Sequence, residues 1–272
     1  MKALVTGANG FLASNVVREL NRRGIPVRAM VRSTADLRAL TGTDAELVFG
    51  NITNIISAME AVRDCDVVIH AAADTSQHRL SYEPYMHVNV TGTFNMLEAS
   101  LKNNVRRFIF VSTANTFGYG TKSNPGSENI PARYPFTASG YAISKMKAQE
   151  LVLEYTREDK LDTVVVNPTF MIGPYDAKPS SGRIITMMHN RRLIPLPPGG
   201  KNFVHVADVA SGICNAIEMG KPGSCYLMAN ENLSYDEFYT KLEKATGRSF
   251  HRVRLSPRLL NFLGTMGTLA VK

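Results

Sequence analysis

Short apolar runs alternate with longer segments of helical periodicity through the first 168 residues of the chain. Each run is rich in Val, Ile and Phe and apolar nearly throughout, which is typical of strands buried on both faces of a parallel sheet. Helical patterns lie between the runs, most clearly over about 84–102 and 138–158. Strands that alternate with helices predict right-handed crossovers and an α/β fold with a doubly wound, mostly parallel sheet. The six runs are ALVTG, PVRAMV, ELVFG, DVVIHAA, RFIFVST and TVVVNP.

Beyond residue 168 the chain becomes rich in Pro and Gly, as in NPTFMIGPYDAKPSSG and LIPLPPGGKN. Such loop-rich segments predict a smaller C-terminal lobe over the carboxyl ends of the strands, where open α/β sheets bind ligands. Ser234 and Glu237 have the spacing of a capping box, which predicts a helix that extends to about Ala245.

The composition is that of an ordinary globular protein, with 272 residues of which 44% are hydrophobic. The three cysteines are widely spaced and fit neither a zinc site nor a disulfide framework, which favours a reduced setting. Met1 is followed at once by the first apolar run rather than by a secretory signal, and no run of about 18 apolar residues is present. We therefore expect a cytoplasmic protein without a metal site or a transmembrane segment.

The formal net charge of +8 is compatible with nucleic acid, an anionic membrane or an anionic ligand. Basic residues are spread along the chain in pairs, and aromatic residues do not alternate with them as they do on single-strand binding surfaces. This distribution disfavours nucleic acid as a partner.

The loop VTGANGFLA, from Val5 to Ala13, lies between the first predicted strand and the first predicted helix. Gly7 allows a tight turn, Gly10 lets the backbone approach a pyrophosphate, and the helix amino end offers amides to phosphate. A turn without a ligand is the alternative, but the position directly after a strand favours a dinucleotide site. The predicted contacts are Thr6, Gly7, Asn9, Gly10, Phe11 and Leu12.

The end of the second strand distinguishes the two nicotinamide cofactors, because a carboxylate there would bind the ribose hydroxyls of NAD and repel a 2′-phosphate. The sequence VRAMVRS has Arg32 there instead, and Arg32 with Ser33 and Arg38 can form charge-assisted hydrogen bonds to a phosphate. We predict NADP(H), and NAD(H) stays the alternative if Arg32 is only a solvated surface residue.

The chain thus divides into a dinucleotide-binding Rossmann domain and a substrate-binding lobe. The Rossmann domain spans 1–168, with 203–228 returning to it, and the lobe consists of 169–202 and 229–272.

The segment YAISKMKAQE places Tyr141 and Lys145 four residues apart, hence on one face of a predicted helix. Read alone, this spacing is more typical of a helix surface than of a site. Its context favours a site, because seven motifs occur in the order found in the extended short-chain dehydrogenase/reductases. These motifs are TGANGFLA, HAAADTS, VNVTGTFNMLEAS, FIFVSTANTFGYG, YAISK, NPTFMIGP and FVHVADVA.

The chain therefore resembles that family, the NAD(P)-dependent epimerase/dehydratase superfamily, from the first strand to about residue 250. Within it, VRAMVRS, GPYDAKPSSGRII and PPGGKNFVHVADVA are most similar to the dihydroflavonol-reductase and 3β-hydroxysteroid-dehydrogenase-like branch.

The resemblance implies that Thr113, Tyr141 and Lys145 do the chemistry. Tyr141 would donate a proton to a carbonyl oxygen as hydride arrives, or remove it in the reverse direction. Lys145 would lower the pKa of the phenol, which is near 10 in a free Tyr, and would bind the nicotinamide ribose. Thr113 would hold the substrate oxygen, although the family more often has Ser there and a Thr can also simply end a strand.

The resemblance also implies further contacts to the cofactor and to a small-molecule substrate. Asn51 stands where the family usually has an Asp, and its carbonyl can still bind the adenine amino group. The other cofactor candidates are Ile52, Ala71, Ala72, Ala73, Pro168 and Met171. The substrate candidates are Thr75, Phe117, Tyr175 and Arg183, each of which fits a core or surface role as well, whereas His78 fits a solvated loop.

We therefore expect an NADP(H)-dependent oxidoreductase that interconverts a carbonyl and an alcohol. The alternatives are a nucleotide-sugar epimerase or dehydratase with bound NAD, and a non-catalytic NADP sensor. Arg32 disfavours tightly held NAD, and the intact Tyr141–Lys145 pair disfavours a sensor. The predicted helices over 84–102 and 138–158 could form a homodimer interface or only cover the sheet.

Overall fold

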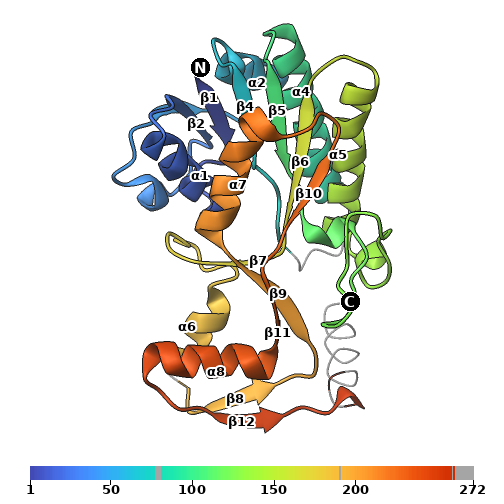
Figure 1. The fold of residues 1–272 in the computed structure, drawn as a ribbon. Helices are drawn as coiled ribbons and strands as arrows, with labels where there is room; N and C mark the ends of the chain where they lie inside the picture. The colour runs from blue at the N-terminus through green and yellow to red at the C-terminus, as the bar shows by residue number, and fades with distance from the viewer. Residues whose placement is uncertain (77–80, 190, 259, 261–272) are drawn as a thin grey trace.

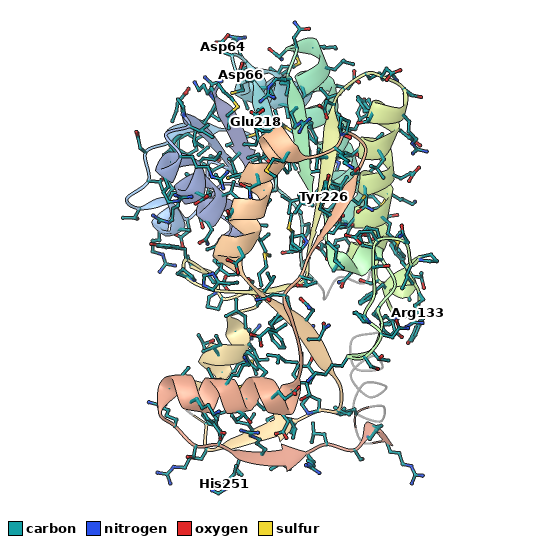
Figure 2. The ribbon with its side chains drawn as sticks, viewed as in Figure 1. Asp64, Asp66, Arg133, Glu218, Tyr226 and His251 are labelled. Atoms are coloured by element: carbon teal, nitrogen blue, oxygen red, sulfur yellow. The ribbon has the colours of Figure 1, made fainter. Side chains whose placement is uncertain are left out.

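A computed structural model describes residues 1–76, 81–189, 191–258 and 260 of the chain. Figure 1 shows a larger part built on one parallel sheet and a smaller part beyond one end of that sheet. Asp64 and Asp66, which precede a strand of the sheet, lie at the opposite pole of the molecule from His251 of the smaller part (Figure 2). The carboxyl ends of the strands therefore face the smaller part.

The large sheet has seven strands, all parallel, in the order β10-β6-β5-β4-β1-β2-β3. The six predicted apolar runs all form strands, which confirms the predicted doubly wound α/β fold. The bounds are β1 Ala3–Thr6, β2 Val27–Val31, β3 Glu46–Phe49, β4 Val67–His70, β5 Arg107–Val111, β6 Thr163–Pro168 and β10 Cys225–Met228.

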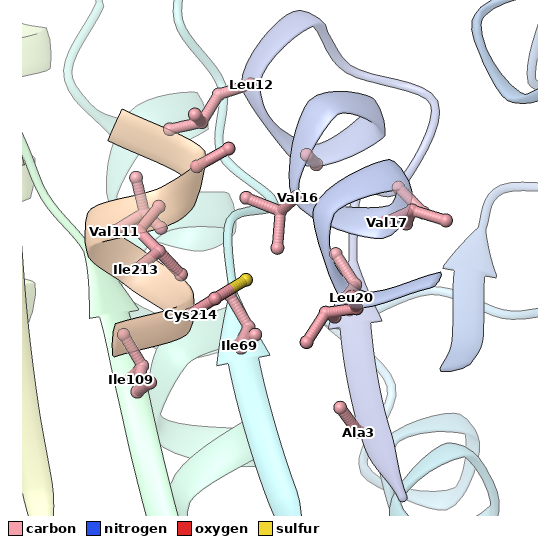
Figure 3. Close-up of a cluster of buried hydrophobic side chains, with 14 of the residues drawn as sticks. Ala3, Leu12, Val16, Val17, Leu20, Ile69, Ile109, Val111, Ile213 and Cys214 are labelled. Carbon is pink, nitrogen blue, oxygen red and sulfur yellow. The ribbon is translucent and has the colours of Figure 1, made fainter. Parts of the chain in front are cut away.

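Helices cover both faces of this sheet, which is why its central strands are mostly apolar between their ends. On one face, α1 (Phe11–Arg22) packs beside α7 (Val206–Met219). Figure 3 shows their apolar side chains meeting over the sheet, where Val16 and Ile213 lie close to Ile69 of β4. The other face is covered by α2 (Ile55–Val62), α4 (Gly92–Lys102) and α5 (Gly140–Arg157).

The helix predicted over 84–102 is divided into three pieces. A short α3 (Glu83–Tyr85) leads into the π-helical segment η2 (Met86–Thr91), and α4 follows without a break. A π-helical turn holds one more residue per hydrogen-bonded ring than an α-helical turn, and such turns are frequent at functional sites. The periodicity of the sequence did not reveal this change, because the segment remains helical on both sides.

The smaller part contains a three-stranded sheet in the order β11-β9-β7 and a two-stranded sheet of β12 and β8. Its core contains an aromatic stack beside aliphatic side chains: Phe203 of β9 stacks on Phe238 of α8 with ring centroids 4.5 Å apart. The predicted capping box is present at Ser234 and Glu237. The elements are β7 Phe170–Ile172, α6 Arg183–His189, β8 Leu193–Leu196, β9 Gly200–His205, β11 Glu231–Ser234, α8 Tyr235–Thr246 and β12 His251–Arg254.

Two connections join the parts closely. The chain returns from β9 directly into α7, and His205 at the end of β9 accepts a hydrogen bond from the backbone N–H of Ala207 through Nδ1 at 3.2 Å. A loop after β5 reaches the smaller part, where Lys122 pairs with Glu237 at 2.5 Å. Within the described ranges, no helix is both long and apolar enough to cross a bilayer.

Candidate active site

Four neighbouring strands of the large sheet, β6, β5, β4 and β1, end at the same edge. Thr6 ends β1, His70 ends β4, Val111 ends β5 and Pro168 ends β6. Residues that follow these strands are therefore brought together although they are far apart in the sequence. Most of the residues that the sequence motifs indicate lie at this edge.

The phosphate loop has the backbone geometry that its glycines were expected to allow. Gly7 has a φ of +63°, and a Cβ there would lie only 2.8 Å from the Cα of Ala72. The backbone N–H of Gly10 donates to the carbonyl oxygen of Gly7 at 2.8 Å, and α1 begins at the next residue, Phe11. No described side chain caps this helix at Gly10. Its first amides are thus available to an anion.

The second strand ends beside a hollow of about 340 Å³. Its lining consists of Arg32, Ser33, Thr34, Phe49, Gly50 and Asn51. Arg32 is exposed, and its guanidinium makes no hydrogen bond or ion pair with the described residues, while its backbone carbonyl accepts from the backbone N–H of Ala35 at 2.9 Å. Arg38, in contrast, pairs with Asp36 at 2.7 Å, and this bond lowers the pKa of Asp36 to about 2. Of the two arginines that the sequence suggested for a phosphate, only Arg32 is free to bind one.

Thr113, Tyr141 and Lys145 meet at the carboxyl end of β5. Thr113 begins the short helix η3 (Ala114–Thr116), and Ser139 caps α5 so that Tyr141 lies in the first turn of that helix. Burial raises the pKa of the Tyr141 phenol to about 12, because it outweighs the polar interaction with the nearby Thr113 side chain, which lowers the pKa.

Lys145 lies one helical turn further along α5, with its side chain only 2% exposed. Its Nζ donates to the carbonyl oxygen of Val111 at 2.7 Å and lies 4.0 Å from the ring centroid of Phe110. Burial lowers the pKa of Lys145 to about 7. The Lys145 ammonium is thus bound to the carboxyl end of β5. The pKa of the Tyr141 phenol is set mainly by burial, and Lys145 does not contribute to its shift.

Asn89, in the π-helical segment η2, was not recognised from the sequence. It is 1% exposed, and its Nδ2 donates to Oγ of Ser144 at 2.9 Å. The Ser144 hydroxyl in turn donates to the carbonyl oxygen of Tyr141 at 2.7 Å. Asn89 also accepts from the backbone N–H of Asp74 at 2.7 Å, so it holds the loop after β4. The sequence signal that could have indicated Asn89 was a polar residue between two valines in VNVTGTF.

A second buried cluster of polar side chains holds the backbone of Thr113 by hydrogen bonds. The carbonyl oxygen of Thr113 accepts from the Thr116 hydroxyl at 2.8 Å and from Nδ2 of Asn167 at 3.2 Å. Asn167 also donates to Oε1 of Gln149 on α5 at 2.8 Å. The signal for Asn167 was a carboxamide in the otherwise apolar run TVVVNP. These bonds fix the backbone of Thr113, while its hydroxyl accepts from the backbone N–H of Asn115 at 3.3 Å.

The remaining cofactor candidates occupy different surroundings. Ile52 is 7% exposed and packs against α4, where a Cβ on Gly92 would lie 2.6 Å from its Cδ1. Asn51 lines the hollow beside Arg32. Pro168 is buried at the end of β6, whereas the half-buried residues are Ala71, Ala72, Ala73 and Met171.

The substrate candidates are dispersed. Thr75 is exposed in the loop after β4, and Phe117 is 8% exposed directly after η3. The ring of Tyr175 lies under the guanidinium of Arg18, 3.7 Å from its centroid, so Tyr175 packs against α1. Arg183 is exposed at the start of α6. His78 lies outside the described residues.

Comparison with known proteins places this site in context. The family model described as the NAD dependent epimerase/dehydratase family matches residues 3–229. Sterol demethylase protein B of Methylococcus capsulatus is 31% identical over 264 residues, which are 96% of this chain and 79% of that protein.

A second relative and one solved structure are similar to this chain to about the same degree. The 4-hydroxy-2-methyl-3-oxo-4-farnesyl-3,4-dihydroquinoline-1-oxide ketoreductase of Stigmatella aurantiaca is 32% identical over 234 residues, 85% of this chain and 68% of that protein. The crystal structure of gox2253 superposes with a TM-score of 0.85 at 32% identity, covering 93% of this chain and 77% of that one.

Replacing Lys145 by Met is expected to stabilise the protein in a pH-dependent way. The folded-state pKa of Lys145, about 7, lies below its ordinary value of 10.5, so the cost of burying the ammonium is full below pH 7 and disappears as the pH rises to 10.5. The free energy of unfolding of Lys145→Met should exceed that of the wild type by roughly 2–4 kcal/mol at pH 6, after the loss of the bond to Val111.

Urea unfolding at pH 6 and pH 9 measures this difference, which should fall by more than half at the higher pH. Lys147→Met, on the exposed side of the same helix, is the control and should show little change at either pH. A gain for Lys145→Met that is equal at both values would contradict the assignment.

Proposed function

We propose, from the premise that the chain belongs to the NAD-dependent epimerase/dehydratase family, that it is an NADP(H)-dependent oxidoreductase interconverting a ketone or aldehyde with an alcohol. Membership in the family confirms the resemblance found in the sequence motifs, and the chain is an enzyme of this family. The observation that carries the finer proposal is that the Tyr141 phenol lies beside Thr113 and one helical turn from the buried Lys145, whose Nζ is bound to the end of β5.

The chemistry of these three side chains suits carbonyl reduction. The nicotinamide cofactor supplies the hydride when bound. Thr113 accepts or donates a hydrogen bond at the substrate oxygen and so fixes its position. Tyr141, whose pKa is raised to about 12, is fully protonated at neutral pH and is therefore ready to act as a general acid toward that oxygen. Lys145 would bind the nicotinamide ribose, as the resemblance implies.

The preference for NADP(H) rests on Arg32. Its exposed guanidinium borders the hollow at the end of β2, together with the hydroxyls of Ser33 and Thr34. A 2′-phosphate bound there would receive charge-assisted hydrogen bonds from all three side chains. Among the described residues that line the hollow, none carries a carboxylate that would repel this phosphate.

In this proposal, residues 1–168 and 203–228 form the domain that binds the cofactor. Residues 169–202 and 229–272 form the lobe that binds the substrate. Two contacts support it: β10 extends the large sheet beside β6, and α7 packs on α1. Residues 190, 259 and 261–272 of the proposed substrate lobe lie outside the described part of the chain. The relatives named for a sterol demethylase and for the reduction of a farnesylated ketone favour a substrate with an apolar body.

Replacing Tyr141 by Phe should abolish carbonyl reduction while the protein still binds its cofactor. Loss of a general acid lowers kcat by about 10²–10⁴-fold. NADPH oxidation with a panel of apolar ketones and aldehydes measures this loss. Tyr155→Phe is the matched control on the same helix, because its hydroxyl donates to Glu98 on α4, and it should retain activity.

If Tyr141→Phe is as active as the wild type, the assignment of the acid is wrong. If the wild type instead converts nucleotide sugars without net oxidation of cofactor, the protein is an epimerase or dehydratase.

Replacing Arg32 by Ala should weaken NADPH binding and leave NADH binding unchanged. A lost charge-assisted bond corresponds to roughly a 10- to 100-fold rise in the NADPH dissociation constant. Fluorescence titration with both cofactors measures it. Arg38→Ala is the control, since Arg38 is already paired with Asp36. Equal losses for NADPH and NADH in Arg32→Ala would show that Arg32 does not read the 2′-phosphate.

We also propose a homodimer formed through the outer faces of α4 and α5, where Phe94 is 45% exposed. Light scattering should give twice the mass of one chain for the wild type and the mass of one chain for Phe94→Lys. A wild type that is monomeric at micromolar concentration would exclude this interface.

A further inference from the structure

His70 is a fully buried histidine with two side-chain hydrogen bonds, and the mechanism above does not use it. It is 0% exposed at the end of β4, with ring centroids 5.9 Å from Phe108 and 5.8 Å from Phe110. Its Nδ1 lies 2.8 Å from Oγ1 of Thr6, and its Nε2 lies 3.1 Å from Oγ1 of Thr93. One imidazole therefore joins β1 to α4.

The direction of these bonds follows from the protons available. The Thr93 hydroxyl donates its single proton to the carbonyl oxygen of Asn89 at 2.7 Å, so it can only accept from Nε2 of His70. Nδ1 must then accept from the hydroxyl of Thr6, which itself accepts from the backbone N–H of Ala72 at 3.1 Å. This pattern requires a neutral ring, and burial together with the charge of Lys145 lowers the pKa of His70 to about 3.

The series of bonds continues beyond Asn89 to the catalytic helix. Nδ2 of Asn89 donates to Oγ of Ser144 at 2.9 Å, and Ser144 donates to the carbonyl oxygen of Tyr141 at 2.7 Å. At its other end, Thr6 immediately precedes Gly7, and Gly7 touches Ala72 so closely that no Cβ fits between them. A continuous series of buried hydrogen bonds thus joins the phosphate loop to the backbone of Tyr141.

We propose that His70 and Thr93 are positioning residues, which hold Tyr141 at a fixed place relative to a dinucleotide bound at the Gly7 loop. The proposal rests on the proposed function, in which Tyr141 transfers a proton beside the nicotinamide. The linking side chains are all buried, with Thr6, Ser144 and His70 at 0% and Thr93 and Asn89 at 1% exposure. Water therefore does not readily replace a lost partner, and one missing hydroxyl interrupts the series.

Two matched pairs of variants test this role. Thr93→Val removes the hydroxyl between His70 and Asn89, whereas Thr163→Val removes an equally buried hydroxyl that donates to Val152 at 3.0 Å outside the series. Ser144→Ala removes the last link, whereas Ser100→Ala removes a buried hydroxyl that donates to Met96 at 2.7 Å. Thr93→Val and Thr163→Val each lose two hydrogen bonds of the buried hydroxyl, so a general loss of stability affects both members of that pair alike. Ser144→Ala loses two such bonds and Ser100→Ala loses one.

The variants within the series should lower kcat about 10-fold at saturating NADPH and carbonyl substrate, with the NADPH dissociation constant changed less than about threefold. The two controls should keep kcat within about twofold. His70→Gln, which can accept from Thr6 and donate to Thr93, should retain most of the activity, whereas His70→Leu should not. Equal kcat values in both members of both pairs would overturn the proposal.

Amide hydrogen exchange over residues 140–146 gives a readout that does not need turnover. Binding of NADPH, or of NADH in a parallel experiment, should slow exchange there in the wild type and in the controls, but not in Thr93→Val or Ser144→Ala. If the wild type reduces no carbonyl while this pattern is found, the proposed function fails and the positioning role stands. If cofactor slows exchange equally in all variants, the positioning role fails. Should Thr93→Val not fold, the Ser144→Ala and Ser100→Ala pair decides.

Discussion

Burial of the large sheet on both faces is the constraint on which the rest of the structure depends. A polar group inside such a sheet loses its contacts with water, so it must find a partner or lie where its strand ends. Thr6 and His70 are the last residues of β1 and β4, and Asn167 is the last but one of β6. The same burial that makes the strands apolar thus gathers hydrogen-bonding groups along the edge that faces the smaller part. The site is a consequence of the layered architecture.

Features that depend on neighbours in the sequence could be predicted, and features that depend on distant partners could not. Apolar runs indicate buried strands directly, and the loop after β1 carries its own signal in Gly7. Asn89, within the π-helical segment, bonds to Ser144 and Asp74, and the periodicity of its own helix does not reveal these distant partners. Tyr175 likewise depends on Arg18, because only the folded chain brings the guanidinium over its ring.

Lys145 shows how far the requirements of folding and of chemistry diverge at one residue. An ammonium with 2% exposure costs the folded state free energy, and the hydrogen bond to Val111 together with the Phe110 ring offsets only part of it, since the pKa still falls to about 7. A residue chosen for stability would be apolar here. The surrounding apolar core on α5 and the central strands contributes the free energy of unfolding that offsets the cost of burying Lys145.

Strand β9 of the smaller part continues directly into α7 of the larger part, so the two parts cannot change orientation without moving α7. His205 ends the strand and caps the helix, so no flexible linker separates the two. A rotation of the smaller part would have to turn α7 against α1, where Val16 and Ile213 belong to one buried apolar cluster over the sheet (Figure 3). Close-packed side chains resist such sliding. A change in the orientation of the smaller part is therefore coupled, through α7, to the packing of the helices on the sheet whose strand ends carry Thr6 and His70.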